Sequence, residues 1–196
     1  YEDYEYYILE LSSFQLENCP TFRPNIAVIT NITNDHLDRY NSIEDYAKAK
    51  FKITTNQNKD DSFLFYAEDK IIKSRLNSVN ASLYPIYTST PINAPNQGAF
   101  IEDSHLIMIT KNNDIMTIED LALQGKHNTY NALAAGLSAR LLNVRSEMVR
   151  ESLADFEGLE HRMENIGTIH GIQFINDSKA TNVNSTYYAL ESINGK

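Results

Sequence analysis

The chain has 196 residues, 42% hydrophobic and 22% charged, a balance that excludes collagen-like and wholly disordered polymers and allows one domain, or one domain and part of a second. Its 17 basic and 26 acidic residues give a formal net charge of -9, which excludes the broad basic surface expected of proteins that bind nucleic acid or anionic membranes. Cys19 is the only cysteine, so no disulfide forms within the chain and we expect a reducing compartment, the cytoplasm.

The two ends of the sequence predict an internal fragment of a longer protein. The chain starts at Tyr1 rather than at a methionine, and it stops at Lys196 directly after a helical pattern. The acidic, aromatic start is unlike a signal peptide, and no run approaches the ~18 apolar residues of a membrane span.

Short unbroken apolar runs at residues 6–9 and 26–29 predict two strands. Such runs are typical of strands covered on both faces, as in the parallel sheet of an α/β fold. Polar residues follow each run, and ligands gather beyond the carboxyl ends of parallel strands. Glu10 and His36, which follow the two runs, could therefore meet at one edge of the sheet.

A helix is predicted from Ser42 through about Thr54, because Ser42 and Asp45 have the spacing of a capping box. At helical spacing Lys50 falls on the apolar side of this helix, opposite Lys48 and Lys52. An ammonium group there is costly unless it is paired or chemically altered. The alternative is a lysine whose stem lies along the core while its charge reaches solvent.

The middle of the chain predicts further strands, one short helix and a loop. Pro85, inside one predicted strand, favours an edge position in the sheet. The predicted strands are 62–66, 83–87, 99–101, 105–109 and 115–118, the helix is 71–76, and the loop is 91–98. The strands from about residue 83 to 120 are predicted to be antiparallel, with a hairpin turn at Asp103 and Ser104.

Two helices and a hairpin are predicted in the last third of the chain. One helix spans 128–142 with Asn128 as its cap, and Ser146 caps a second helix that ends near Phe156. Residues 158–162 break the pattern and predict a linker. Strands at 166–169 and 172–175 then flank a two-residue turn, and a last helix is predicted over 185–193.

Three sets of residues are candidates for chemistry. Glu10 and His36 are competent cation ligands, and carboxylate oxygens suit Mg²⁺; the alternative is a structural role for each. Asn128 and Asn131, one helical turn apart, could address a purine edge, or could be a helix cap and a surface amide. The third set could bind phosphate or carboxylate near a helix start, or could be a solvated loop with an ion pair. It consists of Arg162, Asp177, Lys179 and Thr181.

Familiar phosphate-binding and hydrolase motifs are absent from the sequence. It has no G-x-x-x-x-G-K-[ST] loop, no G-x-G-x-x-G turn and no G-x-S-x-G elbow. The residues alone therefore predict an α/β domain with an anion or metal site, and they name no reaction.

Several strings together resemble the Mur ligases, ATP-dependent amide-forming enzymes of peptidoglycan precursor synthesis. Two of the strings, SSFQL and NDSKATN, point within the family to the members that add D-glutamate. The strings are ELSSFQLE at 10–17, NITNDHLDRY at 31–40, GKHN at 125–128, NALAA at 131–135, HR at 161–162 and NDSKATN at 176–182.

The resemblance implies two Mg²⁺ sites and a modified lysine. Glu10 would bind a Mg²⁺ near the nucleotide phosphates, and His36 a second Mg²⁺ near the muramoyl substrate. Lys50 matches the lysine that these enzymes carbamylate, which would convert a cation on an apolar face into a carboxylate-like metal ligand. His36, Lys50 and Lys179 are the implied catalytic residues.

The resemblance also implies where the substrates bind. Asn128 and Asn131 match residues on the adenine side of ATP, and Arg162 and Asp177 match ATP contacts. The region that receives the incoming amino acid matches Lys179 and Thr181, while Ser12 and Gln15 are weaker candidates for lining the muramoyl site.

The implied protein is a monomer that binds no nucleic acid and no membrane, with UDP-N-acetylmuramoyl-L-alanine and D-glutamate as substrates. The implied fold is the family's central ATPase-like domain over residues 1–157, mainly a parallel sheet with a small antiparallel part, and then the start of a Rossmann-like C-terminal domain over 158–196. The family's phosphate loop would precede Tyr1, so the chain alone is expected to be inactive. The alternatives are another Mur ligase, a folylpolyglutamate synthase-like ligase, or a non-catalytic binding domain of the same fold.

Overall fold

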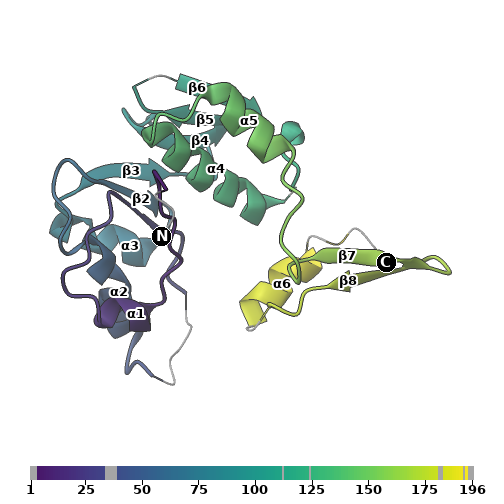
Figure 1. The fold of residues 1–196 in the computed structure, drawn as a ribbon, viewed down its shortest axis with the longest axis horizontal. Coiled ribbons are helices and arrows are strands. Elements are labelled where there is room, and N and C mark those ends of the chain that lie inside the picture. The colour runs from purple at the N-terminus through teal and green to yellow at the C-terminus, as the bar shows by residue number, and fades with distance from the viewer. Residues whose placement is uncertain are drawn as a thin grey trace. The chain divides into compact units, whose positions relative to one another are not determined.

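The computed structural model describes residues 4–33, 39–111, 113–123, 125–180, 183–191 and 193. It divides the chain into two compact units, Tyr1–Pro85 and Ile86–Lys196, whose elements are labelled in Figure 1. Within the described residues no helix is both long and apolar enough to cross a membrane.

The first unit is built on a parallel strand pair. The strands β1 (Ile26–Ile29) and β2 (Ser62–Tyr66) run in the same direction, with Ile26 opposite Ser62 and Ile29 opposite Phe65. Phe63 and Leu64 have no exposed surface, as expected for a strand covered on both faces. The helices of this unit are α1 (Ser13–Glu17), α2 (Ile43–Phe51) and α3 (Lys70–Arg75), with 3₁₀ turns at Lys52–Thr54 and Leu76–Ser78.

The predicted strand at residues 6–9 is wrong. No described strand pairs with this segment, and Tyr7, Ile8 and Leu9 are 71%, 95% and 61% exposed. An apolar run becomes a strand only where a neighbour takes up its backbone N–H and C=O groups. The composition of such a run does not specify that neighbour.

The predicted edge position of Pro85 is also wrong. The strand β3 (Ser82–Ile86) lies between β2 and β4 (Gly98–Glu102) in the strand order. The parallel pairing with β4 begins only at Ile86, opposite Ala99, and Tyr87 N donates to Ala99 O at 2.9 Å. Because Pro85 precedes these bonds, its missing N–H removes none of them.

The second unit contains an antiparallel meander covered by two helices (Figure 1). The strands β4, β5 (His105–Ile109) and β6 (Asn113–Thr117) pair in sequence order, and the predicted turn at Asp103 and Ser104 is confirmed. The helix α4 (Lys126–Leu141) packs on β4, β5 and α5 (Ser146–Ala154). Leu106 of β5 and Leu133 and Leu137 of α4 have no exposed surface. A 3₁₀ turn at Ile118–Asp120 follows β6.

Neither predicted cap of these helices is correct. The helix α4 begins at Lys126 with Gly125 at its N-cap, at φ 102, a backbone conformation that side chains with a Cβ rarely adopt. Asn128 therefore lies inside the first turn. The N-cap of α5 is Arg145, and Ser146 is the first helical residue.

The chain ends with the predicted hairpin and helix. The strands β7 (Glu164–Ile169) and β8 (Ile172–Asn176) pair in antiparallel fashion, and α6 (Val183–Glu191) follows. His170 and Gly171 form the turn at φ 51 and 80, as a two-residue hairpin requires. The predicted linker lies in the irregular stretch between α5 and β7, and the predicted domain boundary at 157/158 stays a prediction.

The fold class is α/β, as the sequence predicts, because parallel pairing at β1–β2 and β3–β4 is followed by antiparallel pairing at β4–β5 and β5–β6. The predicted antiparallel arrangement from about residue 83 is wrong for β3, which pairs with β4 in parallel, and begins only at β4.

Asp61 makes the stability of the first unit depend on pH. Its carboxylate accepts hydrogen bonds from Arg23 Nε at 2.8 Å and from Asn58 N at 2.9 Å, and its side chain is 2% exposed. The Arg23 guanidinium, together with the Asn58 amide, holds the pKa of Asp61 below its ordinary value. The ionised carboxylate therefore stabilises the fold at neutral pH, and this contribution is lost as the pH falls through the unfolded value, about 3.9, toward the lower folded one.

We expect Asp61→Asn to lower the Tm of the full-length protein at neutral pH by a few degrees, because Arg23 is 45% exposed and solvent screens the pair. The difference from wild type should shrink below about pH 4. Thermal unfolding followed by circular dichroism at several pH values checks this, with Asp60→Asn at the exposed neighbouring position as the matched control. An equal Tm difference at all pH values would contradict it.

Candidate functional site

Ser12 and Gln15 form a capping box at the start of α1. Gln15 N donates to Ser12 Oγ at 3.2 Å, and Ser12 N donates to Gln15 Oε1 at 2.8 Å. The two side chains also bond to each other at 3.1 Å. Both residues therefore have a structural role that the sequence reasoning missed, although the spacing Ser-x-x-Gln is the signature of this box. Their role at a muramoyl site stays a prediction.

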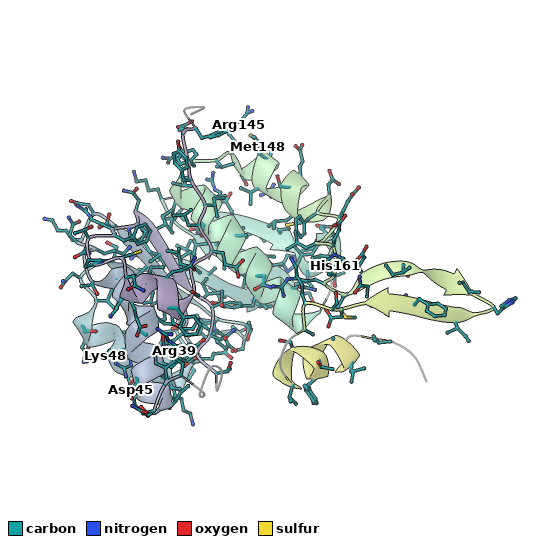
Figure 2. The ribbon with its side chains drawn as sticks, turned by 60° about the horizontal axis from the view of Figure 1, so that its bottom comes forward. Arg39, Asp45, Lys48, Arg145, Met148 and His161 are labelled. Atoms are coloured by element: carbon teal, nitrogen blue, oxygen red, sulfur yellow. The ribbon has the colours of Figure 1, made fainter. Side chains whose placement is uncertain are left out.

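Lys50 lies on the apolar side of α2, as predicted. It is half-buried, and its Nζ lies 5.1 Å from the centroid of the Tyr46 ring. Tyr46 is 5% exposed, so the ammonium group faces an aromatic surface that attracts cations. Lys48, labelled in Figure 2, and Lys52 are exposed.

An aromatic cluster joins the helix of Lys50 to the helix of Gln15. The Tyr46 ring lies 5.4 Å from Tyr40, and Tyr40 stacks on Phe14 of α1 at 6.0 Å. The guanidinium of Arg39, labelled in Figure 2, lies over the Phe14 ring, 4.5 Å from its centroid. The same group pairs with Glu17, with Nη2 3.1 Å from Oε2. Two candidates of the first unit, Gln15 and Lys50, therefore lie on helices that pack together.

The predicted cation ligands are only partly described. Glu10 is exposed in the extended segment before α1, and His36 lies outside the described residues. Among the residues that are described, no group of three His, Cys, Asp or Glu side chains could hold a metal ion. The predicted meeting of Glu10 and His36 therefore stays a prediction.

Asn128 and Asn131 lie in the first two turns of α4, with Asn128 half-buried and Asn131 exposed. Between them Thr129 is buried, and its Oγ1 donates to Gly125 O at 3.1 Å. That bond fixes the start of the helix. The two amides thus stand one turn apart at a helix N-terminus, where positive dipole ends favour a negatively charged ligand.

The third set of candidates is brought together at the open end of the β7–β8 hairpin. Lys179 N donates to His161 O at 3.1 Å, and Met163 N donates to Asp177 Oδ1 at 3.1 Å. Arg162 lies in the sequence between His161 and Met163, whose backbone makes these two bonds. Arg162 and Lys179 are exposed and Asp177 is half-buried, while Thr181 lies outside the described residues.

Glu164 and Asn176 are paired at the open end of this hairpin, and sequence reasoning missed both. Glu164 Oε2 accepts hydrogen bonds from His161 N at 2.8 Å and from Asn176 Nδ2 at 3.1 Å. Glu164 follows His161 by three residues, the spacing at which a side chain can reach back to a turn amide. That spacing was the available signal, but it is common in loops of every kind.

A groove elsewhere in the second unit contains none of the predicted site residues. It lies beside β5, β6 and α5, and its polar lining residues include His105, Asp120, Arg150 and Glu151.

The sequence matches the family model of the Mur ligase middle domain over residues 1–139. A UDP-N-acetylmuramoylalanine–D-glutamate ligase of Bacteroides thetaiotaomicron is 50% identical over 199 residues, covering 100% of this chain and 44% of the relative. A ligase of the same name from Christiangramia forsetii is 45% identical, covering 98% of this chain and 43% of the relative. The chain thus spans less than half the length of these relatives.

Two solved structures with a similar fold are named as ligases. A pseudomurein peptide ligase type C from Methanothermus fervidus matches with a TM-score of 0.70 and 23% identity, covering 95% of this chain and 44% of that one. The MurF ligase from Thermotoga maritima, solved in complex with ADP, matches with a TM-score of 0.64 and 12% identity, covering 92% of this chain and 42% of that one. At these identities the likeness establishes the fold.

Proposed function

Because this chain belongs to the Mur ligase family, we propose that it is part of an ATP-dependent ligase that adds D-glutamate to UDP-N-acetylmuramoyl-L-alanine in peptidoglycan precursor synthesis. The observation that carries the proposal is the 50% identity, over the whole chain, to a relative named for that reaction. The chain spans 44% of that relative, so we expect ligation to need the full-length protein, which we propose acts in the cytoplasm as a monomer.

The proposed reaction has two steps. A carboxylate oxygen of the muramoyl substrate attacks the γ-phosphorus of ATP, giving an acyl phosphate and ADP. The neutral amine of D-glutamate then attacks the acyl carbon, phosphate leaves, and the amine proton passes to a base or water. We assign Lys179 and Thr181 to the incoming amino acid, and Arg162 and Asp177 to the nucleotide.

The charges of the second unit support that assignment. Arg162 and Lys179 belong to two loops joined by the bond between Lys179 N and His161 O, so two cations lie on one pair of loops. Paired cations suit the phosphates of a nucleotide and the carboxylates of an amino acid. On the adenine side we assign Asn128 and Asn131, whose amides both donate and accept.

The first unit is proposed to hold Mg²⁺, which would offset the negative charge between the ATP phosphates and the substrate carboxylate. Glu10 fits this ion because its carboxylate is exposed and offers hard oxygen ligands. Lys50 fits only after carbamylation, since its ammonium form repels a cation. We therefore propose Glu10, His36 and carbamylated Lys50 as the residues that hold the two ions, and Ser12 and Gln15 as residues near the muramoyl group.

Phosphate release by the full-length protein tests the proposal. We expect ATP-dependent release with UDP-N-acetylmuramoyl-L-alanine only when D-glutamate is added, and not with L-glutamate, L-alanine or diaminopimelate. Release with another acceptor would move the protein to a sister ligase with the same mechanism. No release with any acceptor would favour a binding domain that has kept the fold.

A further inference from the structure

Arg162 is held between two residues with unfavourable backbone conformations. His161 has φ 67 and Met163 has φ 48, in the left-handed region that residues with a Cβ avoid. Two such residues flanking one side chain need surrounding contacts that hold them in place. The neighbouring bonds identify those contacts.

Two carboxylates hold the two sides of this turn. Glu164 Oε2 accepts the His161 backbone N–H at 2.8 Å, and Asp177 Oδ1 accepts the Met163 backbone N–H at 3.1 Å. The backbone amides on both sides of Arg162 are therefore fixed by side chains from the hairpin strands or the loop after them. Charge-assisted bonds of this kind are stronger than bonds between neutral groups.

Glu164 is itself held by Asn176, which faces it across the hairpin. The two residues are register partners at the open end of β7 and β8. Asn176 Nδ2 donates to Glu164 Oε2 at 3.1 Å and also lies 2.8 Å from His161 Nδ1. The carboxylate thus receives one hydrogen bond from the turn and one from the opposite strand, which couples the turn to the hairpin.

The Arg162 guanidinium takes no part in these bonds. It is exposed, and among the described residues it makes neither a hydrogen bond nor an ion pair. The turn therefore presents a cation whose backbone is fixed and whose charge is available to an anion.

We propose that Glu164 is a positioning residue, which fixes the His161–Met163 turn so that Arg162 meets a phosphate group of the bound nucleotide. This inference rests on the proposed function, which assigns Arg162 to ATP. Glu164 would touch no substrate and would act only through Arg162. A purely structural role would instead stabilise the hairpin without changing nucleotide affinity.

The test is a double-mutant cycle in the full-length protein, read out as ATP affinity and as the KM for ATP in phosphate release. We expect Glu164→Ala to weaken ATP about tenfold, with a much smaller change in kcat, and Arg162→Ala to weaken it at least as much. Because Glu164 acts through Arg162, adding Glu164→Ala to Arg162→Ala should cause no further loss. Glu164→Gln, which keeps an oxygen acceptor, should restore most of the affinity.

The matched control is Glu160→Ala, which removes the same charge from an exposed position near the same turn and should leave ATP affinity unchanged. Where Glu164→Ala does not fold, Asn176→Ala takes its place in the cycle, because it removes one of the two donors to the carboxylate. Additive losses, or a Glu164→Ala protein that behaves like the control, would overturn the inference.

Titration calorimetry with ATP and Mg²⁺ separates this inference from the proposed function, because it needs no turnover. A non-additive cycle in a protein that ligates nothing would overturn the proposed function and keep Glu164 as a positioning residue. Ligation with D-glutamate combined with an additive cycle would do the reverse. Absence of ATP binding by the wild-type protein would overturn both.

Discussion

Replacement of Lys50 by arginine should lower the ligation rate of the full-length protein by about 100-fold or more. Arginine keeps the positive charge and can keep the contact with the Tyr46 ring, which the lysine makes at 5.1 Å, but it cannot form a carbamate. If the role of Lys50 were only that cation contact, the arginine variant would stay active. The rate of ATP-dependent phosphate release with D-glutamate checks the prediction.

Two measurements make this test specific to Lys50. Lys48→Arg changes an exposed lysine of the same helix and should leave the rate within a factor of about two. With carbon-13 bicarbonate, the wild-type protein should show a carbamate resonance that the Lys50→Arg protein lacks. An active Lys50→Arg variant would refute the assignment of Lys50 as a metal-holding residue.

Removal of either partner of the Asp114–Arg140 ion pair should destabilise the second unit by about 3–5 kcal/mol. Arg140 Nε lies 2.6 Å from Asp114 Oδ2, and the two side chains are only 12% and 6% exposed. The guanidinium also donates to Val144 O, so it joins β6 to the end of α4. Loss of one partner leaves a buried charge without compensation, which costs more than the intact pair contributes.

Chemical denaturation of Asp114→Ala and Arg140→Ala measures this effect. The double variant Asp114→Leu/Arg140→Leu should cost much less than the sum of the single changes, because no isolated charge remains. Arg145→Ala is the control, since Arg145, labelled in Figure 2, is exposed a few residues along the chain. A loss of less than about 1 kcal/mol in both single variants would show that the pair is screened by solvent.

The strand order of this fold depends on partners that periodicity does not encode. The runs at 26–29 and 62–66 became strands because each found a parallel neighbour, whereas the equally apolar run at 6–9 is exposed in the described structure. Local rules failed in the same way at Pro85, where the neighbouring ladder starts one residue later than the proline. The turns at Asp103–Ser104 and His170–Gly171 were predicted correctly, because the turn residues themselves favour the positive φ that these hairpins require.

In the candidate site, too, features set by residues close in the sequence could be predicted, and contacts between distant residues could not. The side of α2 on which Lys50 lies could be predicted, because helical spacing alone determines it. The bond from Met163 N to Asp177, which joins residues 14 positions apart, could not be predicted from spacing, because it depends on the pairing of two strands. The bond from Asn176 to Glu164, 12 positions apart, is of the same kind, whereas the bond from His161 N to Glu164 is local.

The contact between Lys50 and Tyr46 favours the ammonium form of the lysine over the proposed carbamate form. The face of an aromatic ring carries the negative part of its quadrupole, so it holds an ammonium group and repels an anionic one. A carbamate on Lys50 would carry its negative charge on two oxygens beyond Nζ, which now lies 5.1 Å from the ring centroid. Uptake of CO₂ would therefore replace the attraction between the ammonium group and the ring by an arrangement in which the carbamate oxygens point away from the face of Tyr46.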